Sequence, residues 1–149
     1  MNTRTSANEN VVGQMIAVFP NPPSIDLART LDLAGYRWKA VSSADDAAKS
    51  EPVEGWAGAV VMCDEDPESG WAICRSLRKN DNPVGHILVL VSGAQLADLE
   101  MRDDLFDDFC LSPFHPRELE SRLRHMFFTE IRGTRESLVE YSGLILNLE

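Results

Sequence analysis

Short apolar runs alternate with amphipathic stretches along most of the chain. Each apolar run is short enough for a buried strand, and the stretches between them place apolar residues at helical spacing. The predicted strands are residues 14–19, 36–41, 57–63, 86–91 and 108–111. The predicted helices are residues 24–33, 43–49, 70–79, 96–105 and 116–128. Five strand–helix repeats predict an α/β fold with a doubly wound, five-stranded parallel sheet.

Local signals define the first predicted helix. Ser24 follows a proline-rich turn and can cap the helix, because its hydroxyl can accept a bond from a free backbone N–H. Gly35 can end it, since glycine adopts the left-handed conformation found just beyond many helices. The apolar positions predict a buried stripe made of Ile25, Leu27, Ala28, Leu31 and Leu33.

Composition divides the chain into four parts. Residues 1–13 are largely polar and predict a disordered tail, and residues 14–131 carry the strand–helix repeats. Residues 132–138 form a polar stretch that we interpret as a linker. Residues 139–149 alternate like an exposed strand, which predicts the start of a second domain that the sequence does not complete.

The charge of the chain argues against direct contact with nucleic acid. With 14 basic and 24 acidic residues the formal net charge is −10, and a field of this sign repels phosphate backbones. Apolar runs all fall short of the roughly 18 residues that a membrane span needs. The first ten residues also lack the apolar centre of a secretory signal, so we expect a cytoplasmic protein without membrane contact.

The three cysteines do not form a metal or disulfide pattern. Cys63, Cys74 and Cys110 are odd in number, lie far apart in sequence and form no C-x-x-C pair. Each falls in an apolar stretch, so we expect buried free thiols.

Candidate chemistry gathers where the predicted strands end. In open parallel sheets, binding sites lie at the carboxyl ends of the strands. Here those ends carry Asn21, Asp64, Ser92 and Ser112. We expect these four side chains to lie at one edge of the sheet.

One stretch carries a more specific pattern. Residues 106–114 read FDDFCLSPF and are followed by Glu118, Leu119 and Arg122. This resembles the A-D-D-Y-x-x-K-P-F…E-L-x-x-R pattern of receiver domains in response regulators of the OmpR/PhoB type. The resemblance covers roughly residues 14–131 and implies the (βα)5 receiver fold, similar to CheY and flavodoxin. Residues 139–149 resemble the opening strands of the winged-helix domain that follows such receivers.

The resemblance implies a phosphorylation site that is incomplete here. In the family an acidic pair and a phosphoacceptor aspartate hold Mg²⁺, while a hydroxyl and a lysine bind the phosphoryl oxygens. Asp64 matches the acceptor and Ser92 the hydroxyl, but Pro20-Asn21 replaces the acidic pair and Ser112 replaces the lysine. One neutral amide does not replace two carboxylates at a Mg²⁺ site. We therefore expect a degenerate pocket with no metal or other cofactor and no enzymatic activity.

The resemblance also implies a pairing surface, made of the fourth helix, fifth strand and fifth helix. Asp108, Glu118 and Arg122 match the family's dimer salt-bridge positions, and Asp107 and Arg124 lie beside them. In a homodimer, Asp107 or Asp108 of one chain would face Arg122 or Arg124 of the other. The alternative is ordinary pairing within one chain, worth about 0–1 kcal/mol for each surface pair.

The leading hypothesis is a regulatory dimerisation domain of a transcriptional regulator, similar to the atypical GlnR type, that pairs without phosphorylation. DNA would be contacted only by the C-terminal winged-helix domain, and a partner protein could supply control. One alternative is a functional phosphoreceiver, in which Glu65 or Asp66 assists Asp64. Another is a stand-alone α/β domain that binds a small ligand or a protein.

Overall fold

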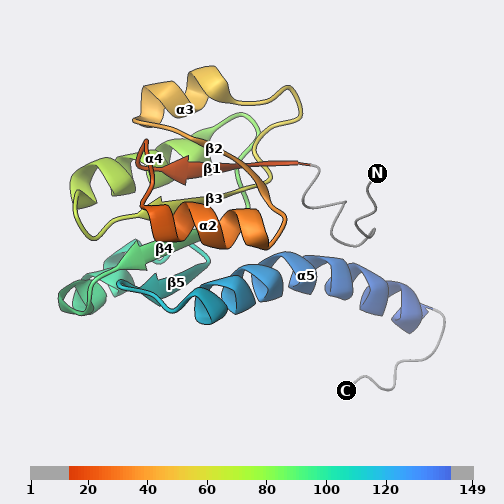
Figure 1. Ribbon diagram of the computed structural model, residues 1–149. Helices are drawn as coiled ribbons and strands as arrows, with labels where there is room; N and C mark the ends of the chain where they lie inside the picture. Colours follow the sequence, from red (N-terminus) through yellow and green to blue (C-terminus); the bar gives the residue numbers. More distant parts are fainter. Residues whose placement is uncertain (1–13, 142–149) are drawn as a thin grey trace.

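A parallel sheet of five strands forms the centre of the fold (Figure 1). The computed structural model describes residues 14–141, with side chains described as far as residue 128. The strands are β1 (Met15–Phe19), β2 (Arg37–Ala40), β3 (Gly58–Met62), β4 (Ile87–Val91) and β5 (Asp108–Leu111). The helices are α2 (Ile25–Leu33), α3 (Ala44–Ser50), α4 (Pro67–Lys79), the 3₁₀ helix η1 (Gly93–Arg102) and α5 (Pro116–Tyr141).

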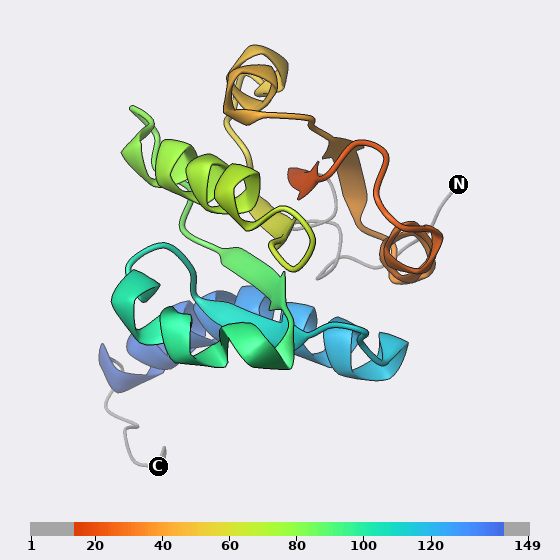
Figure 2. The same cartoon turned by 90° about the vertical axis from the view of Figure 1, so that its left-hand side faces the viewer.

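The sheet has the order β2-β1-β3-β4-β5, and every neighbouring pair is parallel. Helices α2 and α5 cover one face, and α3 and α4 cover the other (Figure 2). The order reverses between β1 and β3, which places the switch point of a doubly wound sheet there. The predicted fold class is confirmed.

Two apolar clusters, one on each face, hold the helices to the sheet. Helices α3 and α4 bury Ala47, Trp71 and Leu77 against the sheet, and Leu99 of η1 joins this cluster. On the other face, the residues of α2 and α5 in the second cluster are Leu27, Leu31, Leu119, Leu123, Met126 and Phe127. All five residues of β4 are fully buried, as expected for a central strand covered on both sides.

The ends of α2 form as predicted, but its buried stripe does not. The Leu27 amide donates to Ser24 Oγ at 3.1 Å, and Gly35 has a positive φ of 87°. Ile25 and Leu33, however, are 75% and 81% exposed. Leu27 and Leu31 face the sheet, and a residue two positions away points to roughly the opposite side of a helix. The prediction that Ile25 and Leu33 are buried was therefore wrong.

Helix α4 begins earlier than predicted, at Pro67. Asp66 is its N-cap, with its Oδ1 accepting a bond from the Ser69 amide at 3.3 Å. Pro67 suits the first helical position, because its missing N–H would have no partner there. The next predicted helix, residues 96–105, is instead the 3₁₀ helix η1, which starts directly after Ser92.

Helix α5 is longer than predicted and continues to Tyr141. Residues 132–138 are therefore helical rather than an irregular linker, and residues 139–141 are helical rather than a strand. The segment contains no proline, and its Arg, Glu and Leu residues favour helix. The predicted tail, 1–13, and the remainder of the predicted second domain, 142–149, lie outside the described residues. The domain boundaries stay predictions.

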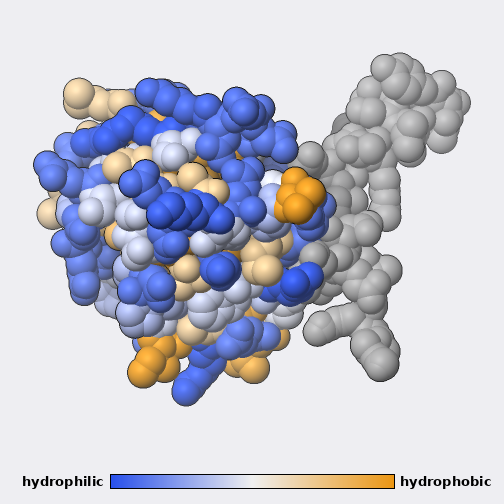
Figure 3. Space-filling model, turned by 90° about the horizontal axis from the view of Figure 1, so that it is seen from above, coloured by the Kyte–Doolittle hydropathy of each residue, from blue (hydrophilic) through white to orange (hydrophobic). Residues whose placement is uncertain are grey.

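The surface is mostly hydrophilic in the view from above, with separate small hydrophobic patches (Figure 3). Six large apolar side chains are exposed among the described residues, namely Ile25, Leu33, Val53, Leu96, Met101 and Leu111. Within the described part of the chain, no helix has the length and apolar character needed to cross a membrane. The cysteines are free and buried, as predicted.

Candidate functional site

The strand register brings the four predicted residues to one edge of the sheet. Phe19 pairs with Val61, Met62 with Leu90, and Val91 with Leu111. The strands therefore end side by side, at the left of Figure 1 where the β1 arrow ends. The first residues beyond these ends include Asn21, Asp64, Ser92 and Ser112.

Asp64 carries a buried carboxylate oxygen that has no hydrogen-bond donor among the described residues. Its Oδ1 is enclosed, and none of the described residues donates a hydrogen bond to it. An enclosed polar atom without a partner costs about 1–3 kcal/mol, more if it is charged. Receiver chemistry would need a cation or donor here.

The acids that follow Asp64 are directed elsewhere. Asp66 caps α4, and losing such a cap typically costs about 0.5–2 kcal/mol. Glu65 is exposed to solvent. Recruiting Asp66 to assist Asp64, as the phosphoreceiver alternative requires, would thus compete with the start of α4.

The residues at this edge are a poor fit to Mg²⁺. Asn21 is exposed and lies between two cis peptide bonds, Phe19-Pro20 and Asn21-Pro22. Across the described residues, no group of three or more His, Cys, Asp or Glu side chains is arranged to hold a metal ion. Asp64 and Asn21 would offer one carboxylate and one neutral amide, which leave half of a divalent charge unbalanced.

Ser92 is held by a residue that the sequence analysis missed. The Ser92 amide donates to Gln95 Oε1 at 2.7 Å, and its hydroxyl lies 3.2 Å from the same oxygen. Gln95 Nε2 in turn donates to the Cys63 carbonyl at 2.9 Å. The S-x-x-Q spacing of a capping box was the available sequence signal.

Ser112 supplies no positive charge at the end of β5. Its amide donates to the Val91 carbonyl at 2.8 Å, and the Ser112-Pro113 peptide bond is cis. None of the side chains of Asn21, Asp64, Ser92, Gln95 and Ser112 is a cation. These five side chains therefore supply no positive charge to offset a phosphoryl group.

The floor beneath Asp64 is tightly packed. Cys63 is fully buried, and a hydrogen bond with Cys74, burial and the nearby Asp64 charge all raise the pKa of its thiol. Gly70 of α4 lies directly against it, since a Cβ on Gly70 would be 2.7 Å from Cys63 Sγ. The helix therefore contacts the residue that precedes Asp64.

Four of the five predicted pairing residues are bonded within the chain. Arg122 lies 3.1 Å from Asp108 and 3.1 Å from Glu118, and its guanidinium sits 5.8 Å from the centre of the Phe109 ring. Arg124 is exposed. In the single chain, Arg122 therefore forms its ion pairs with Asp108 and Glu118 of the same chain. Pairing between two chains stays a prediction.

Asp107 has a structural role. Its Oδ2 accepts from Arg78 Nη2 at 3.0 Å and from the Ile87 amide at 2.8 Å. Arg78 also donates to the Val84 and Asp104 carbonyls, at 2.8 and 3.1 Å. Asp107 thus joins α4 to the start of β4 and the segment before β5.

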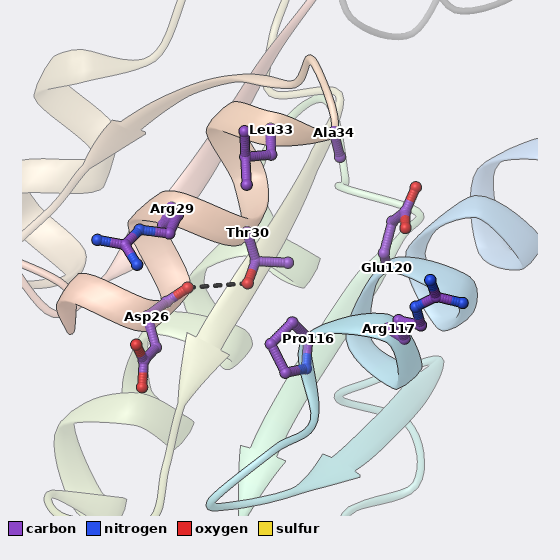
Figure 4. A pocket seen from close by; sticks show the side chains of 8 residues that line it. All are labelled: Asp26, Arg29, Thr30, Leu33, Ala34, Pro116, Arg117 and Glu120. Atoms are coloured by element: carbon purple, nitrogen blue, oxygen red, sulfur yellow. Dashed lines mark hydrogen bonds between the residues drawn. The ribbon is translucent and has the colours of Figure 1, made fainter.

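A hollow between α2 and α5 forms a second candidate site that sequence reasoning did not find (Figure 4). Two arginines and two acids line it together with a small apolar floor: Asp26, Arg29, Thr30, Leu33, Ala34, Pro116, Arg117 and Glu120. The Thr30 hydroxyl is turned into the helix, where it donates to the Asp26 carbonyl at 2.8 Å. The hollow depends on how two helices pack, which no local motif encodes.

Several proteins of known structure have a fold similar to that of this chain. No family model matches the chain. The receiver domain of the sensor histidine kinase PA1611 from Pseudomonas aeruginosa is similar, with 22% identity, a TM-score of 0.62, and coverage of 76% of this chain and 96% of that one. That receiver domain has a magnesium ion coordinated in its active-site cleft.

Two longer proteins of known structure are also similar over part of their length. DrrB, an OmpR/PhoB homolog from Thermotoga maritima, shows 20% identity and a TM-score of 0.63, over 78% of this chain and 54% of that one. NtrX from Brucella abortus shows 15% identity and a TM-score of 0.68, over 89% of this chain and 31% of that one. The chain therefore has the fold of a response-regulator receiver domain.

Proposed function

We propose that this chain is a regulatory domain of an OmpR/PhoB-type transcriptional regulator, similar to the atypical GlnR type, that acts without phosphorylation. The observation that carries the proposal is the edge around Asp64. This edge offers one carboxylate, no cation among its site side chains, and a Ser92 hydroxyl already placed against Gln95. An aspartyl phosphate would carry about two negative charges, and none of the side chains of Asn21, Ser92, Gln95 and Ser112 is a cation that would offset them.

We further propose that the domain forms a homodimer through η1, β5 and the first turns of α5, here called the pairing face. Leu96, Met101 and Leu111 are exposed on η1 and β5 and would supply its apolar contacts. Four charged residues of this face already form ion pairs within the chain, namely Asp107, Asp108, Glu118 and Arg122. The other charged residues of the face would be available to a partner. These are Asp98, Glu100, Asp103, Asp104 and Arg124.

Pairing would hold two C-terminal winged-helix domains at the spacing of two DNA half-sites. The net charge of −10 favours an arrangement in which this chain stays away from the DNA phosphates. DrrB, which is similar to this chain over about half of its own length, is described as an OmpR/PhoB homolog. A cytoplasmic location and control by a partner protein belong to the same proposal.

A functional phosphoreceiver is the second candidate, favoured by one observation. Asp64 and Ser92 follow neighbouring strands, as an acceptor and its hydroxyl partner would. The PA1611 receiver domain, which has the same fold, holds magnesium in its active-site cleft.

One experiment distinguishes the phosphorylation-independent domain from the phosphoreceiver. The protein is incubated with Mg²⁺ and acetyl phosphate, and its intact mass is then measured. The proposal predicts no phosphoryl adduct on wild-type protein, as on the Asp64→Asn control. An adduct on the wild type that Asp64→Asn abolishes would establish the phosphoreceiver instead.

Equilibrium sedimentation tests the pairing face. Arg124→Glu reverses a charge on that face, and Lys49→Glu makes the same change on α3, which packs on the opposite side of the sheet from α5. The proposal predicts weaker self-association for Arg124→Glu only. Equal self-association of both variants and the wild type would reject this face.

A further inference from the structure

The side chain of Gln95 connects the ends of two neighbouring strands. Its Oε1 accepts from the Ser92 amide at 2.7 Å and lies 3.2 Å from the Ser92 hydroxyl, just after β4. Its Nε2 donates to the carbonyl of Cys63, just after β3, at 2.9 Å. Gln95 is half-buried, so these contacts are partly shielded from water.

A capping box explains only part of this arrangement. Capping Ser92 requires an acceptor at the third helical position, and a glutamate serves there as well as a glutamine. The bond to Cys63 requires a donor, which a carboxylate lacks at neutral pH. A glutamate would instead place an anion against the Cys63 carbonyl and near Asp64. The contact with Cys63 therefore needs an amide.

The bond to Cys63 also ties the start of η1 to the residue before Asp64. Cys63 is itself held in place, because its amide donates to the Leu90 carbonyl at 2.7 Å and Gly70 packs against its thiol. Gln95 thus fastens η1 to a rigid point of the sheet, and η1 carries the exposed Met101 of the pairing face.

We propose that Gln95 is a positioning residue that takes the place of a bound phosphoryl group as the acceptor for Ser92 and so fixes η1 in one position without modification of Asp64. The link from η1 to self-association rests on the proposed function, whereas the local part of the inference does not. Gln95→Glu keeps the acceptor for Ser92 and removes the donor for Cys63. Gln95→Ala removes both.

NMR-detected amide hydrogen exchange on the full chain tests the local part, with circular dichroism to confirm that each variant is folded. In Gln95→Ala the Ser92 amide loses its acceptor and should exchange about tenfold faster, as expected for loss of about one hydrogen bond. Gln95→Glu should keep Ser92 protected but speed exchange in residues 93–99, because η1 is no longer fastened to Cys63. Gln14→Ala, at the chain's other glutamine, should change neither.

Two results would overturn the inference. If Ser92 keeps its wild-type exchange rate in Gln95→Ala, Gln95 does not hold it. If Gln95→Glu matches the wild type throughout residues 93–99, the bond to Cys63 positions nothing and Gln95 is only a cap. Equilibrium sedimentation of the same variants tests whether the position of η1 affects pairing. Gln95→Ala and Gln95→Glu should both self-associate more weakly than the wild type. A wild-type monomer would refute the proposed pairing and leave the exchange rates to decide the role of Gln95.

Discussion

Replacing Gly70 with alanine probes the contact between α4 and the floor of the candidate site. A Cβ at this position would lie 2.7 Å from Cys63 Sγ, closer than such atoms can approach. It would also lie 3.3 Å from both the Cys63 Cα and the Met62 carbonyl oxygen. Since two of these three neighbours are backbone atoms, at the end of β3 and in the residue after it, the helix itself would have to move.

The net cost follows from two opposing effects. Overpacking a buried contact costs about 1–3 kcal/mol. Alanine in place of glycine within a helix recovers about 0.5–1 kcal/mol through its smaller backbone entropy loss. The difference between these two effects spans about 0–2.5 kcal/mol, and from the middle of that range we expect Gly70→Ala to lower the free energy of unfolding by about 1 kcal/mol.

Urea unfolding followed by circular dichroism measures this change. Gly93→Ala is the matched control, because a Cβ there would meet no atom within 4 Å, and its stability should stay within about 0.5 kcal/mol of the wild type. Adding Cys63→Ala to Gly70→Ala removes the Sγ and should recover part of the loss. A Gly70→Ala variant as stable as the wild type would refute the close packing of α4 on β3.

Three further predictions concern groups around the same sheet. Asp107→Ala should lower the free energy of unfolding by about 1–3 kcal/mol in urea, because it removes the acceptor of Arg78 and of the Ile87 amide; a change below 0.5 kcal/mol would contradict this role. Burial raises the pKa of Tyr36 from 10.0 to about 12, so its phenol stabilises the fold fully below pH 10 and that contribution is lost as the pH rises toward 12. In thermal melts, the melting temperature of Tyr36→Phe should therefore fall less steeply above pH 10 than that of the wild type. An equally steep fall in both proteins would contradict this role of Tyr36. The hydrogen bond with Cys74 and burial raise the pKa of Cys63, so a thiol reagent should label it only as fast as the protein opens; labelling at the rate of a free thiol would rule this out.

Much of the fold could be predicted from the sequence because parallel strands buried on both faces leave continuous apolar runs. The runs at residues 57–63 and 86–91 predicted β3 and β4 to within one residue at each end. Helix faces were harder, because apolar residues need not all face the core. Ile25 and Leu33 fit a helical stripe, but they lie on the side of α2 that the sheet does not reach.

The site was predicted in position but not in detail. Strand ends meet at one edge whenever the sheet is parallel, so Asp64, Ser92 and Ser112 could be grouped from their order alone. The contacts of Gln95 with Cys63 and of Asp107 with Arg78 span 32 and 29 residues. Such contacts depend on how separate elements pack, and no local pattern encodes them. Asp107 accordingly resembled an intersubunit residue in sequence but is bonded to its own chain.

The central claim is that the domain pairs without phosphorylation, and equilibrium sedimentation with and without Mg²⁺ and BeF₃⁻ tests it most directly. BeF₃⁻ mimics a phosphoryl group on an aspartate, so it would report any ability of Asp64 to act as an acceptor. The account predicts a dimer with the same dissociation constant in both conditions and in Asp64→Asn. A wild-type chain that is monomeric alone and dimerises only with BeF₃⁻, in a manner that Asp64→Asn abolishes, would contradict it.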